Sequence, residues 1–124
     1  MLVAAFLTLE GYRISWPLEP APYDLLVTHA SETPSRVQVK PSVNREAGTW
    51  VCALTRHVYS PKNRWHERQV YVLAEIDSFG VVDGELGIYL IPAAVVGGLS
   101  AIHLRCYSRY RLGALPGPAG PSRV

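Results

Sequence analysis

The stretch YDLLVTHASETPSRVQVKP, residues 23–41, decides which fold we expect of this chain. It has the pattern of two β-strands joined by a polar turn. Val37 and Val39 alternate with Gln38 and Lys40 on the second strand, and alternate residues of a strand point to opposite faces of a sheet. The valines are therefore expected to face the core, with Gln38 and Lys40 together on the other face. If the two strands pair as a hairpin, Asp24 lies close to them.

These side chains have the chemistry of a metal-dependent hydrolytic site. Mg²⁺ prefers oxygen ligands, which Asp24 can supply as a carboxylate, Gln38 as an amide and Val39 as a backbone carbonyl. Lys40 can orient or help deprotonate the attacking water, or neutralise the charge that develops at phosphorus. A nearby cation would lower the pKa of Lys40 and favour the basic role. The alternative is that Gln38 and Lys40 belong only to the solvent face of a sheet.

The composition indicates one soluble domain. The chain has 124 residues, of which 48% are hydrophobic and 18% charged, and its net charge of +2 neither identifies nor excludes a nucleic-acid partner. Two cysteines without CxxC or Cys/His spacing do not predict a zinc site. The apolar N-terminus lacks a basic segment and a cleavage site, and no apolar run is long enough to span a bilayer. We therefore expect no membrane contact and a cytoplasmic location, or a phage-encoded protein that acts in the host cytoplasm.

The rest of the chain predicts a helix followed by at least five strands, which indicates a single α/β domain over residues 1–112. The helix is expected over residues 2–9, with Gly11 as its stop. A polar loop is expected over 57–69 and either a strand or a helix over 101–112. The Gly/Pro-rich tail 113–124 is expected to be disordered. Strands are expected over 12–18, 23–27, 36–40, 49–56 and 85–92, and strand content interrupted near Asp77 over 70–82.

Four segments resemble one known family in their order and spacing. They are GYRISWPLEPAPYDLLV (11–27), RVQVKP (36–41), EIDSFGVV (75–82) and GIYLIP (87–92). Together they resemble the PD-(D/E)XK nuclease superfamily, and more closely its small branch related to intron-encoded homing endonucleases and archaeal Holliday junction resolvases. The resemblance covers residues 1 to about 111. It implies a restriction-endonuclease-like fold, with a mixed β-sheet core flanked by helices.

The resemblance also implies roles for individual residues. Asp24 would be the metal ligand, Gln38 would take the place of the superfamily's Glu or Asp, and Lys40 would be the catalytic lysine. Asp77 matches a recurrent Asp of the branch, although a cap or turn residue is the alternative. The implied activity is a Mg²⁺- or Mn²⁺-dependent endodeoxyribonuclease that leaves a 5′-phosphate.

The sequence departs from the family pattern in ways that concern the metal. Many relatives carry a metal-binding Glu in the first helix, but this chain has no acid there before Glu10. Either the true start lies upstream or the site has lost a ligand. Gln38 lowers the negative charge of the site, and Pro41 stands where relatives more often have a small hydroxyl residue. These departures favour the alternative of a catalytically inactive nucleic-acid-binding protein on the same scaffold.

Binding to DNA would need basic and aromatic side chains that contact phosphates and bases. An enzyme that cuts both strands of a duplex would need two active sites, and this predicts a homodimer or higher homo-oligomer. Trp65 and Trp50 can stack on bases or pack. The run LIPAAVVGGL, residues 90–99, is a candidate interface or a core segment. A third possibility is an interaction domain without a nucleic-acid partner. The candidate DNA-binding residues are Arg36, Arg56, Tyr59, Lys62, Arg64 and Arg68.

Overall fold

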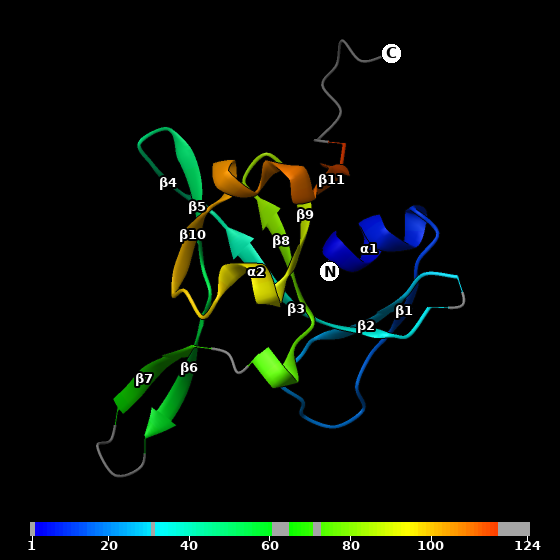
Figure 1. The fold of residues 1–124 in the computed structure, drawn as a ribbon, viewed down its shortest axis with the longest axis horizontal. Coiled ribbons are helices and arrows are strands. Elements are labelled where there is room, and N and C mark those ends of the chain that lie inside the picture. The colour runs from blue at the N-terminus through cyan, green and yellow to red at the C-terminus, as the bar shows by residue number, and fades with distance from the viewer. Residues whose placement is uncertain (1, 31, 61–64, 71–72, 117–124) are drawn as a thin grey trace.

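The computed structural model describes residues 2–30, 32–60, 65–70 and 73–116, and for 56–60, 65–70 and 73 it describes the backbone alone. The described chain forms a mixed α/β fold (Figure 1). Its main feature is a six-stranded sheet in the order β1-β2-β3-β8-β9-β11. The strands are β1 (Arg13–Ser15), β2 (Leu25–Thr28), β3 (Ser35–Ser42), β8 (Ser78–Asp83), β9 (Gly87–Pro92) and β11 (Arg111–Ala114).

Strand β3 lies near the middle of this sheet and pairs with two strands of different direction. It runs antiparallel to β2, with Leu25 opposite Val37, and parallel to β8, with Gln38 opposite Phe79. The parallel pair needs a long crossover connection, and residues 43–77 provide it. This crossover carries β4 (Asn44–Glu46), β5 (Thr49–Ala53), β6 (Thr55–Ser60), β7 (Trp65–Val70) and the 3₁₀ turn η1 (Leu73–Glu75).

One face of the sheet is covered by helix α1 (Leu2–Leu9), as Figure 1 shows. Val3, Phe6 and Leu7 of this helix form one core cluster with apolar residues of the sheet that include Val37. Gly80 of β8 makes the close approach possible. A Cβ at this glycine would lie only 3.0 Å from Val3 and 3.1 Å from Val37.

The opposite face of the sheet is covered by a second group of elements. These are β5, helix α2 (Ala93–Val96), β10 (Ala101–His103) and the 3₁₀ segment η2 (Leu104–Tyr110). β5 lies in a three-stranded sheet between β10 and β4. A second core cluster forms here, and it joins Phe79 and Val81 of β8 to Cys52 of β5. Because α1 and these elements cover opposite faces, β3 has a core cluster on either side.

Several predicted elements are confirmed. α1 occupies residues 2–9, Val37 is fully buried on the α1 side, and the strand predicted over 85–92 is found as β9 over 87–92. The segment over 101–112 combines a strand, 3₁₀ turns and a further strand. β11 reaches Ala114, two residues into the predicted disordered tail, and the Leu115 N–H donates to the Leu86 carbonyl at 2.9 Å. Residues 117–124 of that tail lie outside the described residues.

The predicted loop over 57–69 is wrong for most of its length. Residues 55–60 and 65–70 form the antiparallel pair β6–β7, with Tyr59 opposite His66. Pairing satisfies backbone hydrogen bonds without an apolar alternation in the sequence, so polarity alone misled the prediction. The predicted strand 49–56 is in turn divided at Leu54, whose N–H donates to the Ser100 carbonyl at 2.8 Å. No helix in the described part of the chain is long and apolar enough to cross a membrane.

Candidate active site

Asp24 is held against β3 by two hydrogen bonds. Its own N–H donates to the Val37 carbonyl at 2.9 Å, and its carboxylate oxygen Oδ2 accepts from the Val39 N–H at 2.9 Å. Asp24 is half-buried and immediately precedes β2. The side chain of Asp24 therefore replaces the strand pairing that would otherwise continue beyond Leu25, and its carboxylate is fixed beside the backbone of β3.

The backbone of β3 directs a carbonyl to the same place. The N–H and C=O of one strand residue point toward the same neighbouring strand. The backbone N–H and C=O groups of Val37 and Val39 point toward β2. Those of Arg36 point toward β8, since the Arg36 carbonyl accepts from the Asp77 N–H at 2.9 Å. The Val39 carbonyl thus faces the edge that Asp24 occupies, beyond the first residue of β2.

Gln38 and Lys40 share the other face of β3, as predicted. Gln38 lies opposite Phe79 in the parallel register and Lys40 lies opposite Val81. Both polar residues are half-buried. The Lys40 ammonium donates to the Thr55 carbonyl at 2.8 Å and so joins β3 to the start of β6. The Lys40 side chain therefore has a defined position.

Cys52 lies close enough to Lys40 for the lysine charge to affect the pKa of its thiol. Burial raises the pKa of the Cys52 thiol to about 11, although the positive charge of Lys40 acts in the opposite direction. Cys52 is fully buried and Cys106 is exposed, and both are free thiols. Lys40 therefore borders the second core cluster on one side.

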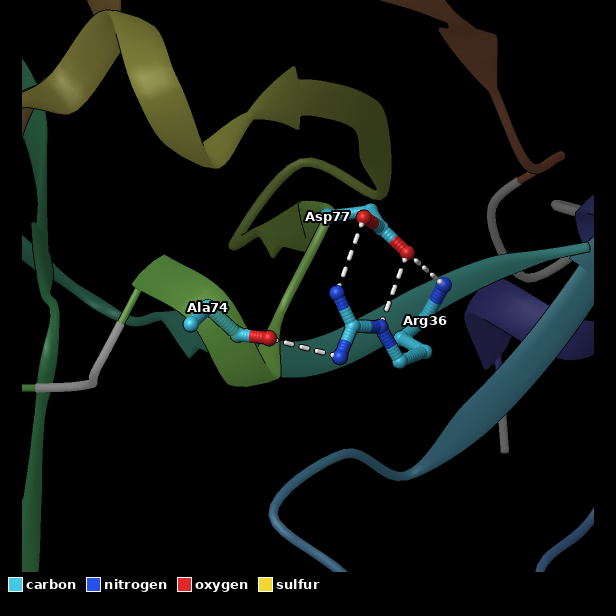
Figure 2. A network of polar contacts seen from close by, with 3 residues as sticks. All are labelled: Arg36, Ala74 and Asp77. Carbon is cyan, nitrogen blue, oxygen red and sulfur yellow. Dashed lines mark hydrogen bonds and ion pairs between the residues drawn. The ribbon is translucent and has the colours of Figure 1, made fainter.

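Arg36 and Asp77 form a network beside these residues, which Figure 2 shows. The Arg36 guanidinium donates to Asp77 through Nε at 3.0 Å and Nη2 at 3.2 Å, and its backbone N–H donates to Asp77 at 2.8 Å. Its Nη1 also donates to the Ala74 carbonyl at 2.7 Å. These side-chain and backbone hydrogen bonds from Arg36 lower the pKa of Asp77.

The hydrogen bonds between Arg36, Asp77 and Ala74 also connect separate elements of the fold. They tie η1 and the start of β8 to β3, on the face that carries Gln38. Arg36 was expected to contact phosphates, and here its guanidinium is bound to Asp77 and Ala74. Asp77 is the partner of Arg36, and its carboxylate connects the residue before β8 to β3.

The other candidate DNA-binding residues fall on or near the β6–β7 hairpin, which projects away from the main sheet in Figure 1. Arg56 and Tyr59 belong to β6 and Arg68 to β7, where the backbone is described. Lys62 and Arg64 lie outside the described residues. Arg56, Tyr59 and Arg68 therefore lie on a two-stranded sheet that is separate from the main sheet.

Two further features at this end of the fold escaped the sequence analysis. An open pocket of about 470 Å³ is lined by residues of the segment 16–24, Asp24 among them. Glu75 of η1 has a buried carboxylate oxygen, Oε2, that finds no hydrogen-bond partner among the described residues. The prolines at 17, 20 and 22 are the one signal in the sequence for the pocket, because they mark an irregular segment directly before Asp24.

The donor atoms around Asp24 fit a hard cation. The Asp24 carboxylate, the Val39 carbonyl and the Gln38 amide are oxygen donors of the kind that Mg²⁺ prefers, and Mg²⁺ usually keeps several waters and binds substrate phosphates. Among the described residues, no three His, Cys, Asp or Glu side chains gather to hold a metal ion. Of the three donors named here, Asp24 is the one with a negative charge, so a metal held by them would depend on this carboxylate for its charge neutralisation.

The family model of the PD-(D/E)XK endonucleases matches residues 1–111. The chain belongs to the PD-(D/E)XK endonuclease family. This confirms the resemblance drawn from the four sequence segments. The solved structure of a bacterial homing endonuclease, I-Ssp6803I, is similar with a TM-score of 0.70 and 23% sequence identity, covering 89% of this chain and 81% of that chain. This likeness confirms the predicted α/β fold with a mixed sheet. No curated protein matches the sequence.

Proposed function

We propose that this member of the PD-(D/E)XK family is a Mg²⁺-dependent endodeoxyribonuclease whose active site contains Asp24, Gln38 and Lys40. The observation that carries the proposal is the hydrogen bond of 2.9 Å from the Val39 N–H to the Asp24 carboxylate. This hydrogen bond holds the Asp24 carboxylate beside Val39, the residue between Gln38 and Lys40. The metal would be held by Asp24, Gln38 and the carbonyl of Val39, and Mn²⁺ could replace Mg²⁺.

In the proposed reaction, Asp24 and Lys40 position the cation and the attacking water and supply charge near the scissile phosphate. A divalent cation, when bound, stabilises negative charge on the phosphoryl oxygens. Asp24 contributes the anionic ligand and is kept in place by the Val39 N–H. Lys40 places its amino group on the same strand, where as an ammonium it stabilises the charge that develops as the phosphodiester bond breaks, or as a neutral amine accepts a proton from the attacking water. Its bond to Thr55 fixes the ammonium before substrate arrives.

The DNA would lie across the end of the fold from which the β6–β7 hairpin projects. Arg56, Tyr59, Lys62, Arg64 and Arg68 belong to this hairpin segment and are proposed to contact the backbone or bases. Arg36 would serve the site indirectly, because its guanidinium is bound to Asp77.

Cleavage of both strands requires two copies of the site, so we propose a homodimer or a higher homo-oligomer. The segment 90–99 was a candidate interface for such an oligomer, and part of it is exposed. Ala93 and Val96 are buried in the core, whereas Val95 and Leu99 are 41% and 51% exposed. Only the exposed residues of this segment are therefore available to a second copy.

An inactive DNA-binding protein on the same scaffold is the second candidate. The observation that favours it is the single carboxylate at the site, since Gln38 stands where the family usually has an acid. Such a protein would bind DNA in EDTA and would lose affinity as salt rises, as phosphate contacts require.

The test is cleavage of supercoiled plasmid and of a four-way DNA junction in Mg²⁺, Mn²⁺ or EDTA. Wild type is compared with Lys40→Ala and with Arg105→Ala, which removes an exposed cation on η2. The nuclease predicts cutting that needs metal, is lost in Lys40→Ala and persists in Arg105→Ala. Binding without cutting by wild type on both substrates would instead support the inactive protein.

A further inference from the structure

The open pocket beside Asp24 differs in character from a phosphate-binding surface. Among the residues that line it are Trp16, Leu18 and Tyr23, together with Asp24 itself. The sequence from 16 to 24 contains no Lys or Arg. Its two acidic side chains, Glu19 and Asp24, both line the pocket. A phosphate group would therefore be repelled from this wall unless a metal lay between.

The same segment exposes large apolar side chains. Trp16 is 55% exposed and Leu18 is fully exposed, at 102%. Prolines at positions 17, 20 and 22 fix their own φ angles and so restrict the backbone of the segment. Trp16 and Leu18 therefore present apolar surface to solvent beside Asp24.

We propose that Trp16 stacks on a nucleobase adjacent to the scissile phosphate, with Leu18 beside it, so that the substrate is a strand with an unstacked base at the cut. The inference rests on the proposed nuclease function, because Asp24 is shared between the pocket and the candidate metal site. An aromatic ring can stack on any base, since every base has a π-face. With a cation on Asp24, Glu19 is the acid that remains in the pocket wall, and a wall with no Lys or Arg fits an uncharged base better than a second phosphate.

The proposal constrains the form of the DNA. In a continuous duplex the faces of each base are covered by its neighbours, and only the base edges are accessible. Trp16 can reach a base face where a base is unpaired, or where apolar side chains have opened a base step. A bulge or a junction offers such a base at lower cost than a fully paired duplex.

The experiment compares affinity for a fully paired duplex with affinity for the same duplex carrying one unpaired base. Binding is measured by fluorescence anisotropy, with Ca²⁺ in place of Mg²⁺, for wild type, Trp16→Ala and Trp16→Phe. Leu9→Ala is the matched control, since Leu9 is 80% exposed on α1 and does not line the pocket. The salt dependence of binding and the mass in solution are measured for each protein.

We expect wild type to prefer the duplex with the unpaired base. Trp16→Ala should bind that duplex about 5- to 100-fold more weakly, with the preference lost. Trp16→Phe should keep part of the preference, and Leu9→Ala all of it. The slope of affinity against salt should not change, because no phosphate contact is removed.

Three results would overturn the inference. Equal preference in wild type and Trp16→Ala would show that the ring does not touch a base, while the nuclease proposal would stand. A fall in mass of Trp16→Ala without a change in preference would mean that a second copy covers the pocket. Failure of wild type to bind either DNA would remove the inference and the proposed function together.

Discussion

The carboxylate of Asp24 accepts a hydrogen bond of 2.9 Å from the backbone N–H of Val39. This contact joins the residue directly before β2 to the middle of β3, fifteen positions further along the chain. It uses one carboxylate oxygen, Oδ2, for structure. The same short stretch of β3 supplies the carbonyl of Val39 and the side chains of Gln38 and Lys40, so the position of Asp24 and the geometry of the site depend on one another.

Replacement of Asp24 by Asn separates these two roles. An Asn oxygen can still accept the Val39 N–H, so the fold should be kept and the melting temperature should change little. The negative charge that would hold a cation is lost. We expect Mn²⁺ affinity, measured by titration calorimetry, to fall at least about tenfold, and metal-dependent cleavage to be lost.

Glu19→Gln is the matched control for Asp24→Asn. Glu19 lines the same pocket and is exposed, so the substitution removes an equal charge without touching β3. Its Mn²⁺ affinity should stay close to that of wild type. Unchanged affinity in Asp24→Asn would contradict the assignment of Asp24 as a metal ligand.

Gln38→Glu should strengthen the site. Affinity for a hard cation rises with the number of charged ligands, so a second carboxylate beside Asp24 should tighten Mg²⁺ binding by about tenfold or more. Cleavage should then reach its maximum at a lower Mg²⁺ concentration. Asn44→Asp adds the same charge on the exposed strand β4 and should leave the Mg²⁺ dependence unchanged. If both variants respond alike, Gln38 is not at the metal.

The sequence predicted the local part of this site well. The alternation of Val37 and Val39 with Gln38 and Lys40 identified the two faces of β3, and buried Val37 confirms the core side. The hairpin that brings Asp24 to β3 followed from a polar turn between two apolar strands. Short-range periodicity was sufficient because these residues lie close together in the chain.

The distant part of the site could not be predicted in the same way. Arg36 meets Asp77 across 41 positions, and the contact exists only because β8 returns parallel to β3. No local pattern states which strand will lie beside another after such a crossover. The β6–β7 hairpin escaped for a different reason, since two strands that pair mainly with each other do not need the apolar alternation by which strands are recognised.

The two cysteines should differ strongly in reactivity. Burial raises the Cys52 pKa to about 11, so only roughly 0.1% of this thiol is ionised at pH 8. Cys106 is exposed. A disulfide reagent should therefore label one thiol rapidly in the folded protein and the second only after unfolding in urea. Cys106→Ser should remove the rapid phase, and a rapid phase that survives this substitution would show that Cys52 is accessible.

The ion pair between Arg36 and Asp77 should make stability depend on acid pH. Hydrogen bonds from Arg36 lower the pKa of Asp77 in the folded protein below that of the unfolded chain, which is about 3.9. The stabilisation is therefore fully present above about pH 4 and is lost as the pH falls through the lower, folded pKa. Asp77→Asn should remove this part of the loss, so its melting temperature should fall less steeply than that of wild type between about pH 4 and pH 2.

The size of this effect should be small, because the two side chains are 35% and 42% exposed and solvent screens their attraction. Glu85→Gln is the control, since Glu85 forms a longer ion pair of 3.7 Å with Arg45. It should leave the acid dependence nearly unchanged. Equal acid dependence in wild type and Asp77→Asn would mean that the pair does not hold β3 to β8 in solution. In that case, Arg36 would be free to contact a phosphate, as expected of a candidate DNA-binding residue.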